Sequence, residues 1–579
     1  MKQFWKMFLA VICAFVAINL AGIVFFFGFK GSLLSGSEAV TVVPDSGVLA
    51  IDMSEFTISE QEEATGDLLT MMQGQAVTVP LSLYKAITAI EAASADPGIQ
   101  YIFLKTDGNT SSIASLAELR KALAEFRRSG KAVIAYTEQI STGSYYLASV
   151  ADKVYSTRYQ GATTAFTGIS TQSFYLKDLL DRFGVNMQLI RHGKYKSAGE
   201  MYIRNSPSDE NKEQYQRLVD SMWETISGEI ALSRGLTVED LDRMVDGLEI
   251  CLPEDLVSKG LVDEIFSREG LKNKLAALAY ADSFDEISFI PFADYAQSRV
   301  QLPFRRKDCI AVIYANGEII DGQDIVQVAG DRFAAVIDKV RKNDRVKAVV
   351  LRVNSPGGSV LASEKIKHEL DLLCESKPVV ASYGDYAASG GYWISNNCDK
   401  IYSDAVTLTG SIGVFGLVPE ISKTLKDVAH VGVYNAKSHK HADMFSLSRP
   451  FDGTEYNYML RSIEAVYDKF TTIVAEGRDL PKERVDEIGQ GRVWTGADAL
   501  NLGLVDEIGG LKDAVVYAAE CAGLDDWQVV EYPKPHTAFE MFLSGLGQNP
   551  EGHRYIEAKI REIAKPSVVA RIPYQITVL

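Results

Sequence analysis

Short apolar runs and amphipathic stretches alternate along two parts of this chain. In the later part, residues 347–353 and 378–382 are apolar runs rich in β-branched side chains, a composition typical of buried strands. Between them Ile366, Leu370 and Leu373 recur at helical spacing, which predicts a helix with one apolar face. A strand, a helix and a strand in this order predict a parallel sheet covered by helices.

The earlier part of the chain repeats the same order. Apolar runs at 99–105 and 131–136 predict two strands, and the pattern over 116–126 predicts the helix between them. We therefore expect two α/β layered domains, each with a parallel sheet.

The two parts are also similar in sequence. Three pairs of segments match at offsets of 243 to 247: 139–156 with 386–403, 131–135 with 377–381, and 260–265 with 503–508. A nearly constant offset over this distance indicates a duplicated domain rather than a short-period solenoid. Each copy has roughly 240 residues, enough for a hydrophobic core of its own.

These patterns divide the chain into four regions. We predict an N-terminal anchor over 1–35, a first α/β repeat over 36–300 and a second over 301–525, joined near residues 303–307. Residues 526–579 form a C-terminal tail that matches neither repeat, and the sequence assigns it no role.

Residues 7–29 contain no charged side chain. As a helix this run would span roughly 34 Å, which is enough to cross the hydrocarbon layer of a membrane. Lys2 and Lys6 precede the run and only Lys30 follows it closely, which favours a cytoplasmic N-terminus with the rest of the chain outside. The alternative is a cleaved signal peptide, but the run is long for one and ends without an Ala-x-Ala site.

Composition excludes several other classes of protein. The chain has 579 residues, of which 47% are hydrophobic and 23% charged, as in ordinary globular domains. Its net charge of −17 argues against a nucleic-acid partner, because phosphate binding requires clustered Lys and Arg. The cysteines and histidines show no metal-ligand spacing and there is no phosphate-binding loop, so we expect neither a metal nor a cofactor.

A glycine-rich motif, Asn-Ser-Pro-Gly-Gly-Ser, occupies residues 354–359 at the carboxyl end of a predicted strand. Open α/β sheets place ligand sites there, and Gly357 and Gly358 allow backbone N–H groups to approach a substrate oxygen closely. A simple tight turn is the alternative. The equivalent residues of the first copy, 106–111, lack the Pro-Gly-Gly sequence.

Ser389 lies in Ala-Ala-Ser-Gly-Gly-Tyr (387–392), between a predicted strand and a predicted helix, and the first copy has Thr142 in its place. Small neighbours allow the hydroxyl to protrude, and the N–H of Gly390 at a helix start can help to stabilise an oxyanion. A serine nucleophile needs a base, and a buried lysine can serve because burial lowers its pKa. The alternative role for Ser389 is that of a helix N-cap.

Four motifs together resemble the signal peptide peptidase A (protease IV) family in its long, duplicated form. They are Ser-Pro-Gly-Gly (355–358), Ala-Ala-Ser-Gly-Gly-Tyr-Trp (387–393), Thr-Leu-Thr-Gly-Ser-Ile-Gly-Val-Phe-Gly (407–416) and Gly-Lys-Tyr-Lys-Ser-Ala (193–198). The resemblance implies two repeats of the Clp protease/crotonase fold after an N-terminal transmembrane helix. It also implies a homotetramer held in the inner, cytoplasmic membrane by a single pass, with its catalytic part on the periplasmic side.

The resemblance further implies a serine endopeptidase that degrades remnant signal peptides after their release by signal peptidase. Its partners would be apolar peptides and the lipid bilayer. Two other classes stay open: a crotonase-like acyl-CoA enzyme, which would share the glycine site but need no serine, and a catalytically inactive membrane scaffold.

By position, the family's nucleophile falls on Ser389 and its general base on Lys196, so the dyad would span the two copies. The oxyanion would be stabilised by Gly357 or Gly358 together with Gly390. Ser411 would orient the lysine, unless it is only a turn serine. Two other lysines compete for the role of base: Lys440, which aligns with Lys196 at an offset of 244, and Lys194.

Overall fold

The computed structural model describes residues 43–61, 79–162, 164–299, 308–534 and 567–571. The predicted anchor at 7–29 and the join at 303–307 lie outside these ranges. Within the described ranges, no helix combines the length and apolar character needed to cross a membrane.

The first repeat is built on a six-stranded sheet in which every paired neighbour is parallel. In sheet order its strands are β10 (Glu264–Phe266), β7 (Lys153–Thr157), β5 (Val133–Thr137), β4 (Ile99–Lys105), β1 (Gly47–Asp52) and β11 (Phe289–Pro291). Two small parallel pairs lie apart from it, β2 (Phe56–Ser59) with β3 (Val79–Ser82) and β6 (Ile140–Ser141) with β8 (Thr164–Ala165). The predicted strand at 99–105 is confirmed as β4, which is buried over most of its length, as expected of a strand covered on both faces.

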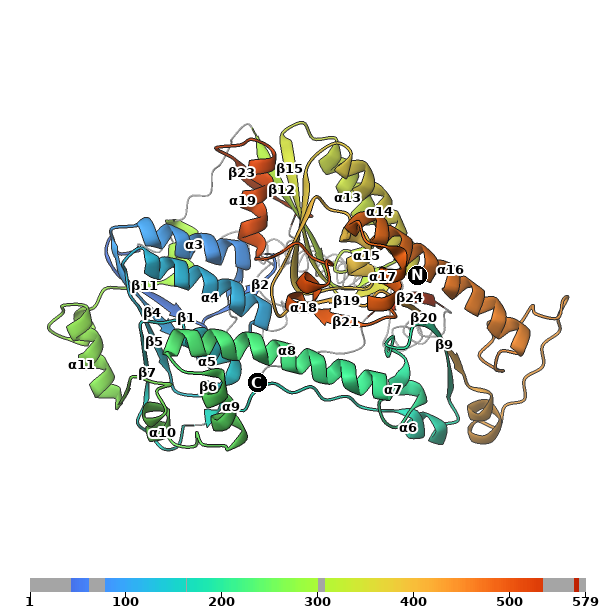
Figure 1. Cartoon of the computed structure of the whole chain (residues 1–579), viewed down its shortest axis with the longest axis horizontal. Coiled ribbons are helices and arrows are strands. Elements are labelled where there is room, and N and C mark those ends of the chain that lie inside the picture. Colours follow the sequence, from blue (N-terminus) through green and yellow to red (C-terminus); the bar gives the residue numbers. More distant parts are fainter. Residues whose placement is uncertain (1–42, 62–78, 163, 300–307, 535–566, 572–579) are drawn as a thin grey trace, which may run out of the picture.

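The helices of the first repeat are α3 (Leu83–Ala95), α4 (Ile113–Arg128), α5 (Thr142–Ala148), α6 (Lys177–Arg182), α7 (Glu200–Ile203), α8 (Asp209–Arg234), α9 (Val238–Asp246), α10 (Pro253–Ser258), α11 (Arg268–Leu278) and α12 (Phe292–Ser298), with a short 3₁₀ turn at Phe284–Glu286. Most of them lie beside this sheet, whereas α6 and α7 lie away from it, at the far end of α8 (Figure 1). The predicted helix at 116–126 is confirmed as the central part of α4, which begins where the Ser112 hydroxyl accepts from the N–H of Ser115.

The second repeat has the same strand arrangement, and the structure therefore confirms the duplication. Its parallel strands are, in order, β22 (Glu507–Ile508), β18 (Lys400–Ser403), β17 (Val379–Ala388), β15 (Val346–Ser355), β12 (Cys309–Asn316) and β23 (Gln528–Tyr532). The C-terminal part of β17, Tyr386–Ala388, also pairs with β19 (Leu408–Gly410). Strand β19 in turn pairs antiparallel with β21 (Val493–Thr495). Strand β23 lies beyond residue 525, so the second sheet takes its last strand from the segment predicted as a tail.

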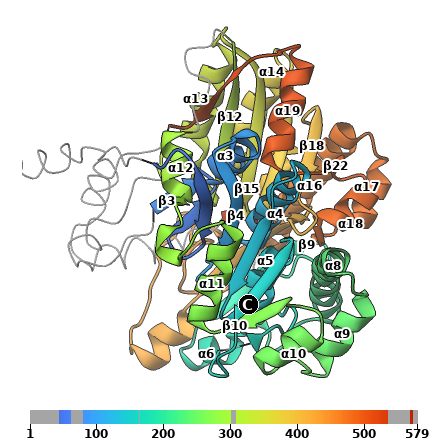
Figure 2. The ribbon, with the colours of Figure 1, turned by 90° about the vertical axis from the view of Figure 1, so that its left-hand side faces the viewer.

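The helices of the second repeat are α13 (Gly330–Arg341), α14 (Val360–Cys374), α15 (Gly390–Ser395), α16 (Gly453–Arg478), α17 (Lys482–Ile488), α18 (Gly496–Asn501) and α19 (Leu511–Cys521), with a π-helical turn at Thr424–Val428. Ile366, Leu370 and Leu373 are all fully buried on α14, as their spacing predicts. In the turned view, β12 and β15 of the second repeat lie above β4 of the first (Figure 2).

A buried ionic cluster joins the two repeats. Arg352 of β15, whose side chain is 1% exposed, donates to both carboxylate oxygens of Glu60 at 2.7 and 2.9 Å and lies 2.8 Å from Glu118. Glu60 and Glu118 both belong to the first repeat. Because a buried charge without its partners is costly, this cluster favours one relative placement of the repeats.

A third sheet mixes strands from distant parts of the chain. Its order is β14 (Val328–Ala329), β13 (Ile319–Ile320), β16 (Gly357–Ser359), β24 (Ser567–Arg571), β20 (Val414–Glu420) and β9 (Asn186–His192). Strand β9 comes from the first repeat and pairs antiparallel with β20 of the second along its whole length, from Asn186 opposite Glu420 to His192 opposite Val414. This pairing carries a segment of the first repeat into the second.

Candidate active site

Ser389 lies at the junction between β17, which ends at Ala388, and α15, which begins at Gly390. Its backbone has φ 57° and ψ −113°, a conformation that is strained for a residue with a side chain. The N–H of Ser389 donates to the carbonyl of Gly410 at 2.8 Å, which holds the junction in place. A serine held on a sharp strand-to-helix turn has a hydroxyl that projects away from the sheet.

Ser411 is brought beside Ser389 by strand pairing. Ala388 of β17 is opposite Gly410 of β19, so the residues that follow these two, Ser389 and Ser411, emerge next to each other. Ser411 also has a positive φ, 51°, and its N–H donates to the carbonyl of Arg492 at 2.7 Å.

Lys196 reaches both serines from the first repeat. It follows β9, whose pairing with β20 ends next to the site, and the N–H of Tyr195 donates to the carbonyl of Gln490 at 2.9 Å. The Lys196 Nζ lies 2.8 Å from Ser389 Oγ, 2.9 Å from Ser411 Oγ and 3.1 Å from the Ser411 carbonyl oxygen. The structure thus places both selected serines within hydrogen-bond distance of the Lys196 amine.

The environment of Lys196 favours the neutral amine. Its side chain is 1% exposed, and its hydrogen-bond partners are neutral oxygens. Burial lowers the pKa of Lys196 from 10.5 to about 7, because the charged form loses its hydration without gaining a carboxylate. An amine with this pKa is present in large part as a free base at neutral pH.

Two glycines leave room for Lys196, one beside its backbone and one beside its side chain. A Cβ placed on Gly491 would lie 2.5 Å from Lys196 Cβ and 2.7 Å from its N and Cα atoms, and Gly491 has φ 79°. A Cβ on Gly413 would lie 3.2 Å from Lys196 Cδ. The sequence motifs did not point to Gly491, which belongs to a turn that follows α17.

Replacement of Gly491 by alanine is therefore expected to reduce turnover about 100-fold or more, because the added methyl group would displace Lys196, and small misplacements of reacting groups have effects of this size. The measurement is kcat on an apolar peptide, with the melting temperature as a check on folding. Gly130→Ala is the matched control, since Gly130 also has a positive φ, 88°, and a Cβ there meets nothing within 4 Å. Equal kcat values for the two variants would contradict this role.

The glycines selected for the oxyanion meet at the start of α15. Gly357 and Gly358 have φ 95° and 156°, and a Cβ on Gly390 would lie 3.1 Å from both Gly357 Cα and Gly358 N. The N–H of Gly357 donates to Ser355 Oγ at 3.2 Å. Only glycine permits this close approach of the two backbone segments beside Ser389.

The two rival lysines lie elsewhere. Lys194 is exposed, and its Nζ lies 5.0 Å from the centre of the Tyr195 ring. Lys440 has a side chain that is 73% exposed, and its Nζ lies 3.6 Å from Asp452 Oδ2 in an exposed loop. Neither makes a contact with Ser389 among those of the described residues.

Histidines 439 and 441 flank Lys440 in this loop, and one of them belongs to a group of possible metal ligands. His441, Asp452 and Glu455 place ligand atoms within 4.8 Å of one another. However, Arg449 donates to both carboxylate oxygens of Glu455, each at 2.7 Å. The Glu455 carboxylate is thus already paired with the Arg449 guanidinium.

The equivalent position in the first repeat has a different chemistry. Thr142 is buried, and its hydroxyl donates to the carbonyl of Gly168 at 3.0 Å.

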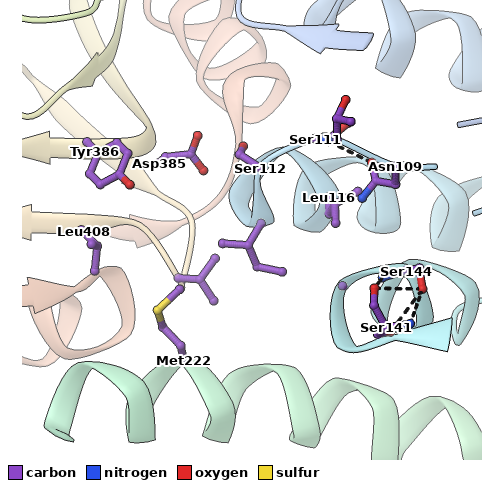
Figure 3. Close-up of a pocket in the computed structure, with 14 residues that line it drawn as sticks. Asn109, Ser111, Ser112, Leu116, Ser141, Ser144, Met222, Asp385, Tyr386 and Leu408 are labelled. Atoms are coloured by element: carbon purple, nitrogen blue, oxygen red, sulfur yellow. Dashed lines mark hydrogen bonds between the residues drawn. The ribbon is translucent and has the colours of Figure 1, made fainter. Parts of the chain in front are cut away.

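A cavity of about 350 Å³ lies beside the helix that carries Thr142 (Figure 3). Its polar walls are made of Asn109, Thr110, Ser111, Ser112, Ser141, Ser144, Asp385 and Tyr386. Burial raises the pKa of Asp385 to about 6, and no lysine or histidine is among the described residues that line the cavity.

Comparison with known proteins gives a consistent result. The model of peptidase family S49 matches residues 125–282 and 372–525, one segment in each repeat. The chain is 35% identical over 506 residues to "Protease 4" of Haemophilus influenzae, covering 84% of this chain and 80% of that protein.

Two further relatives extend the comparison. "Serine protease SPPA, chloroplastic" of Arabidopsis thaliana is 29% identical over 519 residues, which cover 86% of this chain and 76% of that protein. "Putative signal peptide peptidase SppA" of Enterococcus faecium is 35% identical over 210 residues, or 36% of this chain and 60% of that protein.

Proposed function

Because this chain belongs to peptidase family S49 and is a serine protease, we propose that Ser389 is its nucleophile and Lys196 its general base. The observation that carries the proposal is the distance of 2.8 Å between Lys196 Nζ and Ser389 Oγ, made by a buried amine. The dyad is split, with the nucleophile on the second repeat and the base on the first.

The contacts of Lys196 suit a neutral amine, which has two N–H groups and one lone pair. Donation of both N–H groups to the carbonyl and hydroxyl oxygens of Ser411 directs the lone pair at the Ser389 hydroxyl. Ser411 thus orients the base.

In the proposed reaction, Lys196 takes the Ser389 proton as Oγ attacks the scissile carbonyl carbon. The N–H groups of Gly390 and of Gly357 or Gly358 stabilise the oxyanion, and each such donor contributes roughly 3 kcal/mol to transition-state stabilisation. The Lys196 ammonium then gives its proton to the leaving amine as the C–N bond breaks. Water, deprotonated by the same amine, hydrolyses the acyl-enzyme and restores Ser389.

The pH dependence of turnover follows from the pKa of Lys196, about 7. Below this pH the amine is protonated and has no lone pair, so kcat/KM is expected to fall about tenfold per pH unit towards pH 5 and to level off above pH 8. The measurement is kcat/KM on an uncharged peptide from pH 5 to 9. A midpoint near 10, the ordinary pKa of lysine, would contradict the assignment of Lys196 as base.

We propose that the substrates are apolar peptides, including remnant signal peptides released by signal peptidase. This rests on the resemblance of the motifs and on the name of the Enterococcus relative. We further propose that each repeat has the Clp protease/crotonase fold. Residues 7–29, outside the described ranges, would anchor the protein in the inner membrane by a single pass, with the repeats on the periplasmic side.

A serine-directed fluorophosphonate probe tests the nucleophile and separates the alternatives. We expect the probe to label a single peptide that contains Ser389, and labelling to disappear in Lys196→Met. A crotonase-like enzyme would instead turn over an acyl-CoA without labelling, and an inactive scaffold would do neither. Either of these two outcomes would overturn the proposal.

Comparison of the two repeats supports the homotetramer that the resemblance implies, because two segments without a strand partner stand in the places of β9 and β20. Residues 430–436 occupy in the second repeat the place of β9 in the first, but they are exposed and belong to no strand. Residues 171–176 stand in the place of most of β20 and are likewise outside any helix or strand. By analogy with β9 and β20, we propose that 430–436 of one copy pair with 171–176 of the next.

Apolar side chains are exposed on both proposed partners. Val431 and Val433 are about half exposed, Tyr434 is 91% exposed and Phe174 is 67% exposed. Strand β9 packs against α16 through Met459, Ile463 and Tyr467, and the equivalent residues of α8 are Tyr215, Val219 and Trp223, all half-buried. A head-to-tail contact gives a ring when its rotation closes, and we propose that this one closes as a tetramer.

Light scattering of the full chain tests this contact. Tyr434→Asp and Phe174→Asp, one on each side, are expected to give a smaller species, because a charge replaces an apolar contact. Tyr280→Asp, at a site 97% exposed and distant from both segments in the sequence, is the control. An unchanged mass for both variants would rule out this interface.

A further inference from the structure

The cavity beside α5 stands where the first repeat would have an active site. The loop before α4, residues 109–112, takes the place of Gly357–Ser359 before α14, since Ser112 and Ser359 are the N-caps of these two helices. In the second repeat this loop touches the start of α15, because a Cβ on Gly390 would lie 3.1 Å from a Gly357 atom. In the first repeat the loop and the start of α5 instead line a cavity of about 350 Å³.

The second repeat closes the other side of this cavity. Asp385 and Tyr386 of β17 and Leu408 of β19 line it, across from residues of α4 and of the loop before it (Figure 3). Thr110 is exposed at the rim, whereas Ser144 and Leu408 are buried. The cavity is thus open to solvent at one side, and a ligand inside it would contact both repeats.

Asp385 supplies the cavity with a carboxylate that has only neutral hydrogen-bond partners. It is half-buried, its Oδ1 accepts from the Ala114 N–H at 3.3 Å, and it also accepts from the Ser112 hydroxyl. No lysine, arginine or histidine is among the described residues that line the cavity. Because a partly desolvated carboxylate is stabilised by a nearby positive charge, the cavity favours a cationic ligand.

The remaining walls suit an ammonium group attached to an apolar stem. Hydroxyl and amide oxygens of residues 109–112, Ser141 and Ser144 can accept the N–H groups of an ammonium. Leu116 and Met222 supply apolar surface beside them. An apolar peptide carries both features at its N-terminus, and every cleavage by a protease releases a new one.

We propose that this cavity binds the N-terminal end of an apolar peptide, with the ammonium group on Asp385 and the first side chain against Leu116 and Met222. The choice of a peptide rests on the activity of the chain as a protease. The binding itself requires neither Ser389 nor Lys196.

A ligand in this cavity contacts the two strands that carry the serines of the candidate active site. Tyr386 and Leu408 are paired across β17 and β19, and they lie three residues before Ser389 and Ser411. Because the dyad is split between the repeats, a ligand that contacts both repeats stabilises the arrangement on which the dyad depends. A released peptide would thereby stabilise the junction of the enzyme that produced it.

Leucinamide tests the chemistry of the cavity, since it has an ammonium group and an apolar side chain but no carboxylate. The measurement is calorimetric titration of Ser389→Ala at pH 7, where an α-amino group is mostly protonated and Asp385, with a pKa raised by burial to about 6, is mostly ionised. We expect a Kd of about 1 mM, as is usual for so small a ligand.

N-acetyl-leucinamide is the uncharged control ligand. It should bind at least about tenfold more weakly, because it lacks the charge-assisted hydrogen bond to the carboxylate. Equal binding of the two compounds would overturn the proposal. Absence of leucinamide binding would also overturn it, and would mean that the cavity holds only water.

Replacement of Asp385 by asparagine in the Ser389→Ala protein tests the position of the ammonium group. Asparagine has the same shape without the charge, so we expect leucinamide binding to weaken at least about tenfold. Asp282→Asn, which removes an exposed charge of the same repeat, is the control and should leave binding unchanged. Saturating leucinamide should raise the melting temperature of Ser389→Ala and not that of the Asp385→Asn double variant. Unchanged affinity in Asp385→Asn would overturn the proposal.

A lysine of a neighbouring copy is a second source of an ammonium group. In the proposed ring, Lys440 of one copy would come to the first repeat of the next. Addition of Lys440→Met to Ser389→Ala is expected to leave the affinity for leucinamide unchanged. Tighter binding in that double variant would identify Lys440 as the occupant and would overturn the assignment to a peptide.

The titrations separate this inference from the proposed function. Every titration uses Ser389→Ala, so absence of leucinamide binding would contradict the cavity proposal alone. Retained peptide turnover by Ser389→Ala would contradict the dyad alone.

Discussion

Replacement of Ser389 by alanine is expected to lower kcat by roughly ten-thousand-fold or more, the size of effect seen when a hydrolase loses its nucleophile. The reason is that no other hydroxyl in the described part of the site has the position of Ser389 Oγ. Ser411 Oγ also lies within hydrogen-bond distance of Lys196, at 2.9 Å, but the oxyanion glycines surround the start of α15 at Gly390.

The Ser389→Ala protein should keep its fold. The Ser389 hydroxyl caps no helix, and its lost partner is a neutral amine that retains two acceptors on Ser411. We expect the melting temperature to change by only a few degrees. Thr142→Ala is the matched control, because Thr142 occupies the equivalent place in the first repeat, and its kcat should stay within about twofold of the parent. Substantial turnover by Ser389→Ala would show that another group is the nucleophile.

Much of the fold could be predicted from the sequence. The apolar runs at 99–105 and 347–353 lie within β4 and β15, and the matching segments at constant offset correspond to two sheets with the same strand order. These patterns are local, and buried parallel strands have a strong and simple one. Strand ends are harder to predict: the strand predicted at 378–382 continues to Ala388, where it pairs with β19, and its own residues do not reveal this pairing.

The candidate site could be predicted only in part, because its parts come from different repeats. The motif around Ser389 and the glycines at 357 and 358 have local signals that follow from a strand-to-helix turn. The choice of Lys196 over Lys440 depended on a resemblance, since the two align and both follow a β-type segment. What distinguishes them is that residues 186–192 form a strand paired with β20, whereas residues 430–436 pair with no strand of the described chain.

Contacts between distant segments account for what the sequence did not reveal. Gly491 matters because it lies against Lys196, which is almost 300 residues earlier. Strand β24 contains an ordinary β-branched run, and only its pairing with β16 and β20 shows where it lies. Neither residue spacing nor composition carries information of this kind.

Comparison of Lys196→Met with Lys440→Met separates the two possible bases. Methionine has nearly the length and apolar volume of lysine without its amine, so at position 196 it should fill the buried space and leave the fold intact. We expect kcat to fall roughly thousand-fold or more, because the Ser389 hydroxyl loses its only basic neighbour among the described residues.

Lys440→Met should keep the parental kcat, since the Lys440 side chain is exposed and its Nζ lies 3.6 Å from Asp452. The same comparison tests a role for Lys440 in the proposed ring. There, residues 430–436 of one copy are expected to lie against the first repeat of the next copy, which has Thr142 in place of the nucleophile. Lys440 placed there would lie beside Thr142, whose hydroxyl already donates to the carbonyl of Gly168. We therefore expect Lys440 to take no part in catalysis in the oligomer either. Loss of turnover in Lys440→Met with retention in Lys196→Met would instead identify Lys440 as the general base.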